Sequence, residues 1–217
     1  MVEQILPRVF HEADGVEDWR VVFEGACAHF CTGTFAVGVA LVDAIGGLAA
    51  AEHTPDIDLR SEGVTVRLTT DGNGGLADVD ITLARQISAA ARELGVSANP
   101  AAVQTVQITI DALVLSEVIP FWRAVLGYRD RGDSPEDLID PCGRGPSLWF
   151  QQMDVPRPQR NRVHVDVSVP HDQAEARIAA AIAAGGHLVT DRFAPQWWVL
   201  ADAEGNEACI ATWVGRE

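Results

Sequence analysis

The second half of the chain repeats one order of elements, and no other feature limits its fold as strongly. Each copy starts with an apolar strand, the first at Gln107 and the second at His164, 57 residues later. Each strand is followed by a helical segment that ends at glycine. An Asp-x-x-Gly turn then precedes another apolar strand, at 140–143 in the first copy and at 202–205 in the second. The repeat therefore predicts two successive β-α-β-β-β modules.

The first half of the chain has a different, mixed order of elements. Residues 19–31 are rich in strand-forming residues, and 64–69 alternate between apolar and polar residues as a half-buried strand does. Helices are predicted at 35–51, with Thr34 as N-cap, and at 77–94, with Gly95 just beyond the end. A short polar stretch, 97–100, follows and ends in proline. We predict two domains, residues 1–98 and 99–217, and an α+β fold.

Charge and composition exclude several functions. The formal net charge of -15 opposes binding to nucleic acid or to an anionic membrane surface. The most apolar window, 35–51, is shorter than the roughly 20 residues that a membrane span needs. The four cysteines form no CxxC pair, and the N-terminus has no basic start followed by an apolar run. We therefore expect reduced thiols, a cytoplasmic location and small-molecule partners.

A motif around His53 gives the first indication of function. A His53-Thr54-Pro55 run follows a helix, and the next strand ends in Thr-Thr-Asp at 69–71. A Gly-Leu-x-x-x-Asp sequence at 75–80 then begins another helix. In this pattern residues 15–95 resemble the pterin-4a-carbinolamine dehydratase family, whose corresponding runs are His-His-Pro, Thr-His and Gly-Leu-x-x-x-Asp. The resemblance implies an antiparallel sheet with helices on one face.

The same resemblance implies a dehydratase for 4a-hydroxytetrahydrobiopterin, a lyase whose chemistry needs proton transfer. Imidazoles suit that task because their unperturbed pKa lies near 6.5. His53 matches the first of three family histidines, while Thr54 and Asp71 stand at the other two catalytic positions. Pro55 and Asp56 are the expected ligand contacts. Because two proton-transfer groups are replaced, the alternatives are a weakened dehydratase and a retained fold without activity.

A second resemblance covers residues 103–214. It is carried by the Phe-Trp-Arg-Ala-Val-Leu-Gly run at 121–127, by Asn-Arg-Val-His-Val-Asp at 161–166 and by Asp-Ala-Glu-Gly-Asn-Glu at 202–207. These residues resemble the glyoxalase/bleomycin-resistance/dioxygenase class, the vicinal oxygen chelate superfamily. The resemblance implies that the paired modules form an open barrel around a cavity that holds a divalent metal in many members.

Carried over by position, the metal candidates are Gln107, Gln151 (or Gln152), His164 and Cys209. Both family carboxylates are missing, and two amides with an imidazole and a thiol suit a hard cation poorly. Glu207 is expected to face the same side as Cys209 only where the strand bends. We therefore weigh a metal site against a metal-free pocket.

Aromatic residues favour a pocket for a planar ligand in this half. Trp149 and Trp198 lie on or beside predicted strands, and Gln107 and His164 are further ligand-binding candidates. Because Trp197 and Trp198 are adjacent, a strand would point them to opposite faces, so only one can line a cavity.

Three functions remain open from the sequence: a dehydratase centred on His53, a metal-dependent glyoxalase or dioxygenase centred on His164, and a binding protein for a planar metabolite. The dehydratase is preferred because its family has one narrow chemistry, whereas the glyoxalase-type fold hosts many reactions. A homodimer is expected by analogy with both families.

Overall fold

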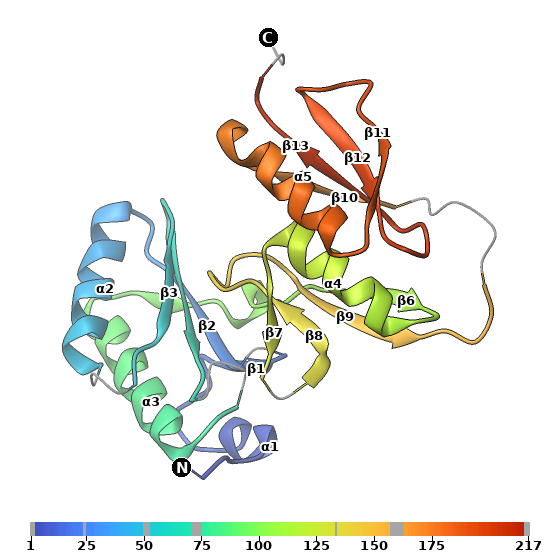
Figure 1. Cartoon of the computed structure of the whole chain (residues 1–217). Helices are drawn as coiled ribbons and strands as arrows, with labels where there is room; N and C mark the ends of the chain where they lie inside the picture. The colour runs from blue at the N-terminus through green and yellow to red at the C-terminus, as the bar shows by residue number, and fades with distance from the viewer. Residues whose placement is uncertain are drawn as a thin grey trace. The chain divides into compact units, whose positions relative to one another are not determined.

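The structure is a computed structural model of the chain, and it describes residues 3–23, 25–49, 53–70, 75–132, 134–156 and 163–214. The chain divides into two compact units, residues 1–105 and 106–217 (Figure 1). The division falls beyond the polar stretch at 97–100, because Ser97 and Ala98 form a short strand, β5, that pairs with a strand of the first unit.

The N-terminal unit is built on one antiparallel sheet with the order β1-β2-β4-β3, in which β5 also pairs with β2. Figure 1 shows α2 and α3 together on one side of this sheet. The elements are α1 (Pro7–His11), β1 (Arg20–Val22), β2 (Gly25–Cys31), α2 (Phe35–Leu48), β3 (Asp56–Leu59), β4 (Gly63–Leu68), α3 (Asp78–Glu93), β5 (Ser97–Ala98) and a 3-10 turn at Pro100–Ala102.

The alternation predicted for 64–69 is what places β4 in the core. Val64, Val66 and Leu68 are fully buried against the helices, while Thr65 and Arg67 are only partly covered. At the start of β2, Gly25 has a φ of 120°, and a Cβ there would lie 2.3 Å from the carbonyl oxygen of Leu68. Only glycine allows this approach, so Gly25 permits the pairing of β2 with β4.

The C-terminal unit has the two β-α-β-β-β modules predicted from the repeat. The first forms a sheet of order β6-β9-β8-β7 and the second a sheet of order β10-β13-β12-β11. In each module the first and last strands are parallel, and the remaining pairs are antiparallel. The first module comprises β6 (Gln107–Ala112), α4 (Leu115–Leu126), β7 (Arg129–Arg131), β8 (Ser134–Ile139) and β9 (Ser147–Gln152). The second comprises β10 (Val165–Ser168), a 3-10 turn (His171–Gln173), α5 (Ala174–Ala183), β11 (His187–Thr190), β12 (Trp197–Ala201) and β13 (Glu207–Ala211).

The two modules share one hydrophobic core and are also joined by hydrogen bonds between polar groups. Side chains of both modules, including Phe121 and Leu200, belong to the same buried cluster. Asp202, buried in the turn before β13, accepts a hydrogen bond of 3.0 Å from the indole nitrogen of Trp122 in α4. The carboxylate of Glu204 accepts bonds from the backbone N–H groups of Leu113 and Val114, at the start of that helix. The last turn of the second module thus holds the chain just before the helix of the first.

In the described part of the chain no helix has both the length and the apolar character that crossing a bilayer demands.

Candidate functional site

In the N-terminal unit, His53 meets a carboxylate of α3. Asp80 lies in the first turn of this helix, where its Oδ2 accepts hydrogen bonds from the Ala77 backbone N–H at 2.8 Å and the Thr70 hydroxyl at 2.6 Å. Its other oxygen, Oδ1, lies 2.9 Å from Nε2 of His53. The helix start therefore fixes the carboxylate, and the carboxylate faces the imidazole.

This pair is shielded from solvent. The Asp80 side chain is fully buried, and that of His53 is 12% exposed. Within the described residues, neither His53 Nε2 nor Asp80 Oδ1 makes a hydrogen bond of normal geometry. The polar contact of each atom is therefore the ion-pair contact between them. Without this imidazole, the buried Asp80 Oδ1 would lose its compensating partner.

The other residues predicted for this site lie in different settings. Thr54 is exposed, and Pro55 is partly buried beside it. Asp56, the first residue of β3, accepts two hydrogen bonds on Oδ2 from the guanidinium of Arg67 in β4. Asp71 lies outside the described residues. The structure thus brings His53 together with Asp80, to which the sequence motif alone assigned no role.

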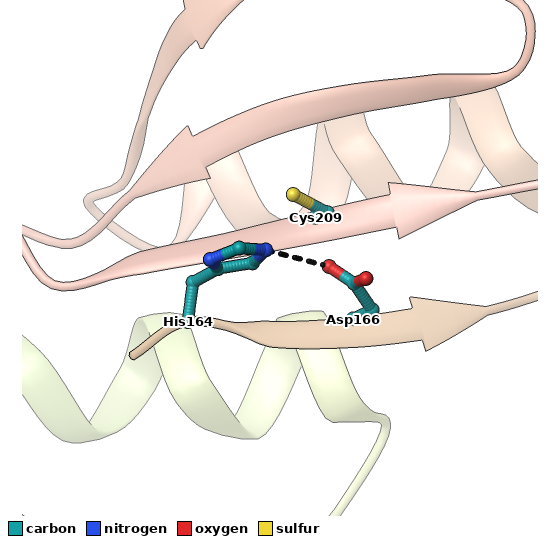
Figure 2. A group of neighbouring side chains, drawn as sticks. All are labelled: His164, Asp166 and Cys209. Atoms are coloured by element: carbon teal, nitrogen blue, oxygen red, sulfur yellow. Dashed lines mark ion pairs between the residues drawn. The ribbon is translucent and has the colours of Figure 1, made fainter. Parts of the chain in front are cut away.

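In the C-terminal unit, three different donor groups converge on one face of the second module. Asp166 of β10 pairs in register with Cys209 of β13, and parallel partners project from the same face of a sheet. His164 precedes Asp166 by two residues and therefore faces the same way. Figure 2 shows the three side chains gathered on that face.

The donor atoms of this cluster lie close together. His164 Nε2 is 3.2 Å from Asp166 Oδ1, and the ligand atoms of all three residues lie within 4.8 Å of one another. The side chains of His164 and Asp166 are 49% and 63% exposed, whereas Cys209 is buried. An imidazole, a carboxylate and a thiol at this spacing fit a divalent ion of borderline softness, and they fit a hard cation less well.

The cluster lines a cavity of about 410 Å³. Its remaining lining residues come from β12 and β13: Trp197, Val199, Glu207 and Ala211. A second cavity of about 590 Å³ shares His164 and Glu207 with the first. Both volumes lie in the range of small-molecule pockets.

Glu207 corrects one expectation from the sequence. It lines the same cavity as Cys209 without any bend in β13, because residues two apart on a regular strand share a face. Asp166 follows from the same rule, since the run His164-Val165-Asp166 places the histidine and the aspartate together. Strand alternation was the signal that could have found both carboxylates.

The predicted aromatic contacts are also placed differently. Trp198 packs against the hydrophobic core, and its neighbour Trp197 lines the cavity instead. The ring of Trp197 stacks on Phe193, with centroids 4.5 Å apart. Trp149 lies in β9 opposite Thr109, and the lining of neither described cavity includes it.

The two glutamines predicted as metal ligands belong to the first module. Gln107 opens β6 opposite Ser147, and Gln151 lies in β9 opposite Asp111. Both are exposed, and neither described cavity has them in its lining. Of the four predicted metal ligands, the structure therefore brings together His164 and Cys209.

Comparison with known proteins finds two families along the chain. Residues 4–90 match the model of pterin 4 alpha carbinolamine dehydratase, and residues 107–211 match that of a glyoxalase-like domain. A protein of Aquifex aeolicus (strain VF5) named "Putative pterin-4-alpha-carbinolamine dehydratase" is 32% identical over 87 residues, which cover 40% of this chain and 88% of that protein. A protein of the same name from Nocardia farcinica is 48% identical over 60 residues, covering 27% of this chain and 63% of that protein.

Among solved structures, a glyoxalase-related enzyme from Fulvimarina pelagi is similar with a TM-score of 0.41 and 19% identity, over 50% of this chain and 87% of that one. The two family models and the Aquifex aeolicus relative define the class, a chain with a pterin-dehydratase unit followed by a glyoxalase-like unit. The chain belongs to the pterin-4a-carbinolamine dehydratase family through residues 4–90, and residues 107–211 form its glyoxalase-like domain.

Proposed function

We propose that the N-terminal unit dehydrates 4a-hydroxytetrahydropterins, 4a-hydroxytetrahydrobiopterin among them, and that His53 transfers the proton. The contact between His53 and the buried Asp80 is the observation that supports this most. A carboxylate facing Nε2 favours a proton on that nitrogen, which leaves Nδ1 as the nitrogen that exchanges protons with a substrate. Asp80 thus acts as a positioning residue for His53.

The reaction balances with this group. The C4a–O bond breaks, the hydroxyl takes up a proton and leaves as water, N5 loses its proton, and a C4a=N5 double bond forms. An imidazole can deliver the first proton and recover the second near neutral pH. Thr54 and Asp71 stand where the family has further histidines, and each acid–base group contributes on the order of 10²- to 10⁴-fold. The proposed activity is therefore weaker than that of a protein with all three imidazoles.

The test is the rate at which 4a-hydroxytetrahydrobiopterin absorbance disappears in the presence of the chain. His53→Ala is expected to lower the enzyme-dependent rate by about 10²-fold or more. The matched control is His11→Ala, because His11 is exposed at the end of α1 and should leave the rate unchanged. An equal rate in the wild-type chain and His53→Ala would refute the proposed role.

We also propose that the two modules of the glyoxalase-like unit form an open barrel. This barrel binds a planar metabolite together with a divalent metal. The cavity beside the stacked Trp197 and Phe193 supports this second function. A flat ring can stack on the exposed part of an indole. Quenching of tryptophan fluorescence by biopterin should be weaker in Trp197→Leu and unchanged in Trp149→Leu, while any quenching from pterin bound to the N-terminal unit remains in both. Equal quenching in both variants would contradict the assignment.

A homodimer is part of the same proposal. The outer side of α2 carries exposed apolar residues, Phe35 at 56% and Val39 at 46%, one helical turn apart. Such a surface is commonly covered in an assembly. Light scattering should give twice the chain mass of 23.3 kDa, and Phe35→Glu should give the monomer. A wild-type chain that is monomeric at high concentration would contradict the proposed homodimer.

A further inference from the structure

We propose that His164, Asp166 and Cys209 hold a thiophilic divalent ion, with Zn²⁺ as the best fit, in a site complete within the second module. The inference rests on the proposed metal-binding function of the glyoxalase-like unit and specifies its ligands and the class of ion. It departs from the ligand set that the family resemblance implies, which draws on both modules.

The backbone fixes the directions of the three side chains. The parallel register of β10 and β13 pairs Asp166 with Cys209, and His164 lies two residues before Asp166. The intervening Val165 pairs with Ala208 and packs toward the core. The donors therefore share a face because the strands alternate, and side-chain rotation alone can adjust their distances.

The spacing suits tetrahedral coordination. Ligand atoms about 2.0 to 2.3 Å from a zinc ion stand roughly 3.3 to 3.8 Å from one another. His164 Nε2 and Asp166 Oδ1 are 3.2 Å apart, and all three donor atoms lie within 4.8 Å. Small rotations of the side chains bring them onto one ion.

The donor types select the ion. A cysteine thiolate and an imidazole are ligands for Zn²⁺ and Co²⁺, whereas Mg²⁺ and Ca²⁺ take oxygen ligands almost throughout. One carboxylate is too little for a hard cation. With three protein ligands, a zinc ion keeps a fourth position open, as in catalytic rather than structural sites.

The open position would face the cavity. Trp197 and Glu207 line the same hollow as the three donors, and Glu207 does not belong to the donor cluster of the described residues. An ion held by the three donors would supply a Lewis acid in the cavity that the Trp197 indole and the Glu207 carboxylate also line. An ordinary buried cysteine next to a surface His–Asp pair is the competing explanation.

The experiment loads the metal-stripped full chain with Co²⁺ and records its absorption. A thiolate on tetrahedral Co²⁺ gives a near-ultraviolet charge-transfer band and visible bands, and elemental analysis of the Zn²⁺-loaded chain should give about one ion per chain. Cys209→Ser should remove the charge-transfer band and weaken Zn²⁺ binding by about 100-fold or more. Cys142→Ser, at an exposed cysteine outside the cluster, is the matched control and should keep both.

The outcomes separate this inference from the function on which it rests. A site within one module predicts that the cobalt band is lost in His164→Ala and in Asp166→Asn. It also predicts that the band is kept in Gln107→Ala and in Gln151→Ala. A different outcome is that the chain binds one Zn²⁺ and yet keeps the cobalt band in Cys209→Ser, or loses it in Gln107→Ala. Either result overturns the inferred ligand set but leaves the proposal that this unit binds a metal. No bound Zn²⁺ or Co²⁺ overturns both. Circular dichroism of each variant shows whether it is folded.

Discussion

Asp140 and Asp202 occupy corresponding positions in the two modules, and each collects N–H groups of the turn that follows it. Asp140 accepts hydrogen bonds from the backbone of Cys142, Arg144 and Gly145. Asp202 accepts them from the backbone of residues two and four positions further on, as Asp140 does. The repeat that was visible in the order of elements therefore extends to single hydrogen bonds.

This arrangement predicts a pH dependence for Asp140. Burial raises the pKa of its carboxyl, but the three N–H donors outweigh burial and lower the pKa below the ordinary value of 3.8. Between the folded-state pKa and 3.8 the unfolded chain binds more protons, so stability rises with pH there and is lost as pH falls through the folded-state pKa. Asp140→Asn should cost about 0.5 to 1 kcal/mol at pH 7 in this partly exposed turn.

Denaturant unfolding of the wild-type chain and of Asp140→Asn, from pH 7 to pH 3, measures the difference between their free energies of unfolding. This difference should become smaller as the pH falls. Asp154→Asn, at an exposed aspartate outside both turns, is the control and should change little. A difference that grows as the pH falls would contradict the interpretation.

Thr54 allows a gain-of-function test of the dehydratase proposal. It is exposed beside His53, and the resemblance to the family implies a histidine at this position. A second imidazole supplies a second group for proton transfer, so Thr54→His should raise the dehydration rate by about 10-fold or more. Thr82→His, on the exposed side of α3, is the control and should not raise it. An unchanged rate in Thr54→His would show that the imidazole at 54 cannot reach the reacting atoms.

At the scale of elements, the period of two in strands explains both what the sequence predicted and what it missed. The alternation at 64–69 identified β4, and the helical spacing at 77–94 identified α3, because a buried stripe leaves a regular pattern in the sequence. The same alternation places Asp166 of β10 and Glu207 of β13 in the cavity, although the metal ligands predicted from the sequence include neither. The contact between His53 and Asp80 could not be derived from spacing, because it joins a loop to a helix 27 residues later.

The adjacent tryptophans of β12 give a prediction at this scale. Trp198 packs on the core of the unit, so Trp198→Ala should destabilise it by about 2 to 3 kcal/mol. Trp197 faces the cavity and stacks on Phe193, so Trp197→Ala should cost about 1 kcal/mol. Thermal unfolding of the pair compares the two directly, and equal losses would contradict the opposite orientations.

At the scale of the whole molecule, the chain combines two units with separate cores. The core of residues 1–105 contains His53's partner helix, and the core of residues 106–217 is shared by the two modules. The sequence predicted two units and the modular repeat, because both leave their mark in the order of elements. The structure divides the chain after residue 105, and Ser97 and Ala98 pair with β2.

Separate cores lead to the expectation that each unit keeps its chemistry without the other. The N-terminal proposal needs no residue beyond α3, and the proposed zinc site needs none before His164. Cys209→Ser in the full chain should therefore remove the cobalt band and leave the dehydration rate unchanged. His53→Ala should do the reverse. A variant that alters both signals would contradict independent sites.

The decisive experiment is the initial rate of 4a-hydroxytetrahydrobiopterin dehydration by residues 1–105 alone, with and without His53→Ala. Residues 1–105 should dehydrate the pterin about as fast as the full chain, and the substitution should reduce that rate to the uncatalysed one. A folded N-terminal unit without activity, or with activity that survives the loss of His53, would contradict a dehydratase built on the His53–Asp80 pair.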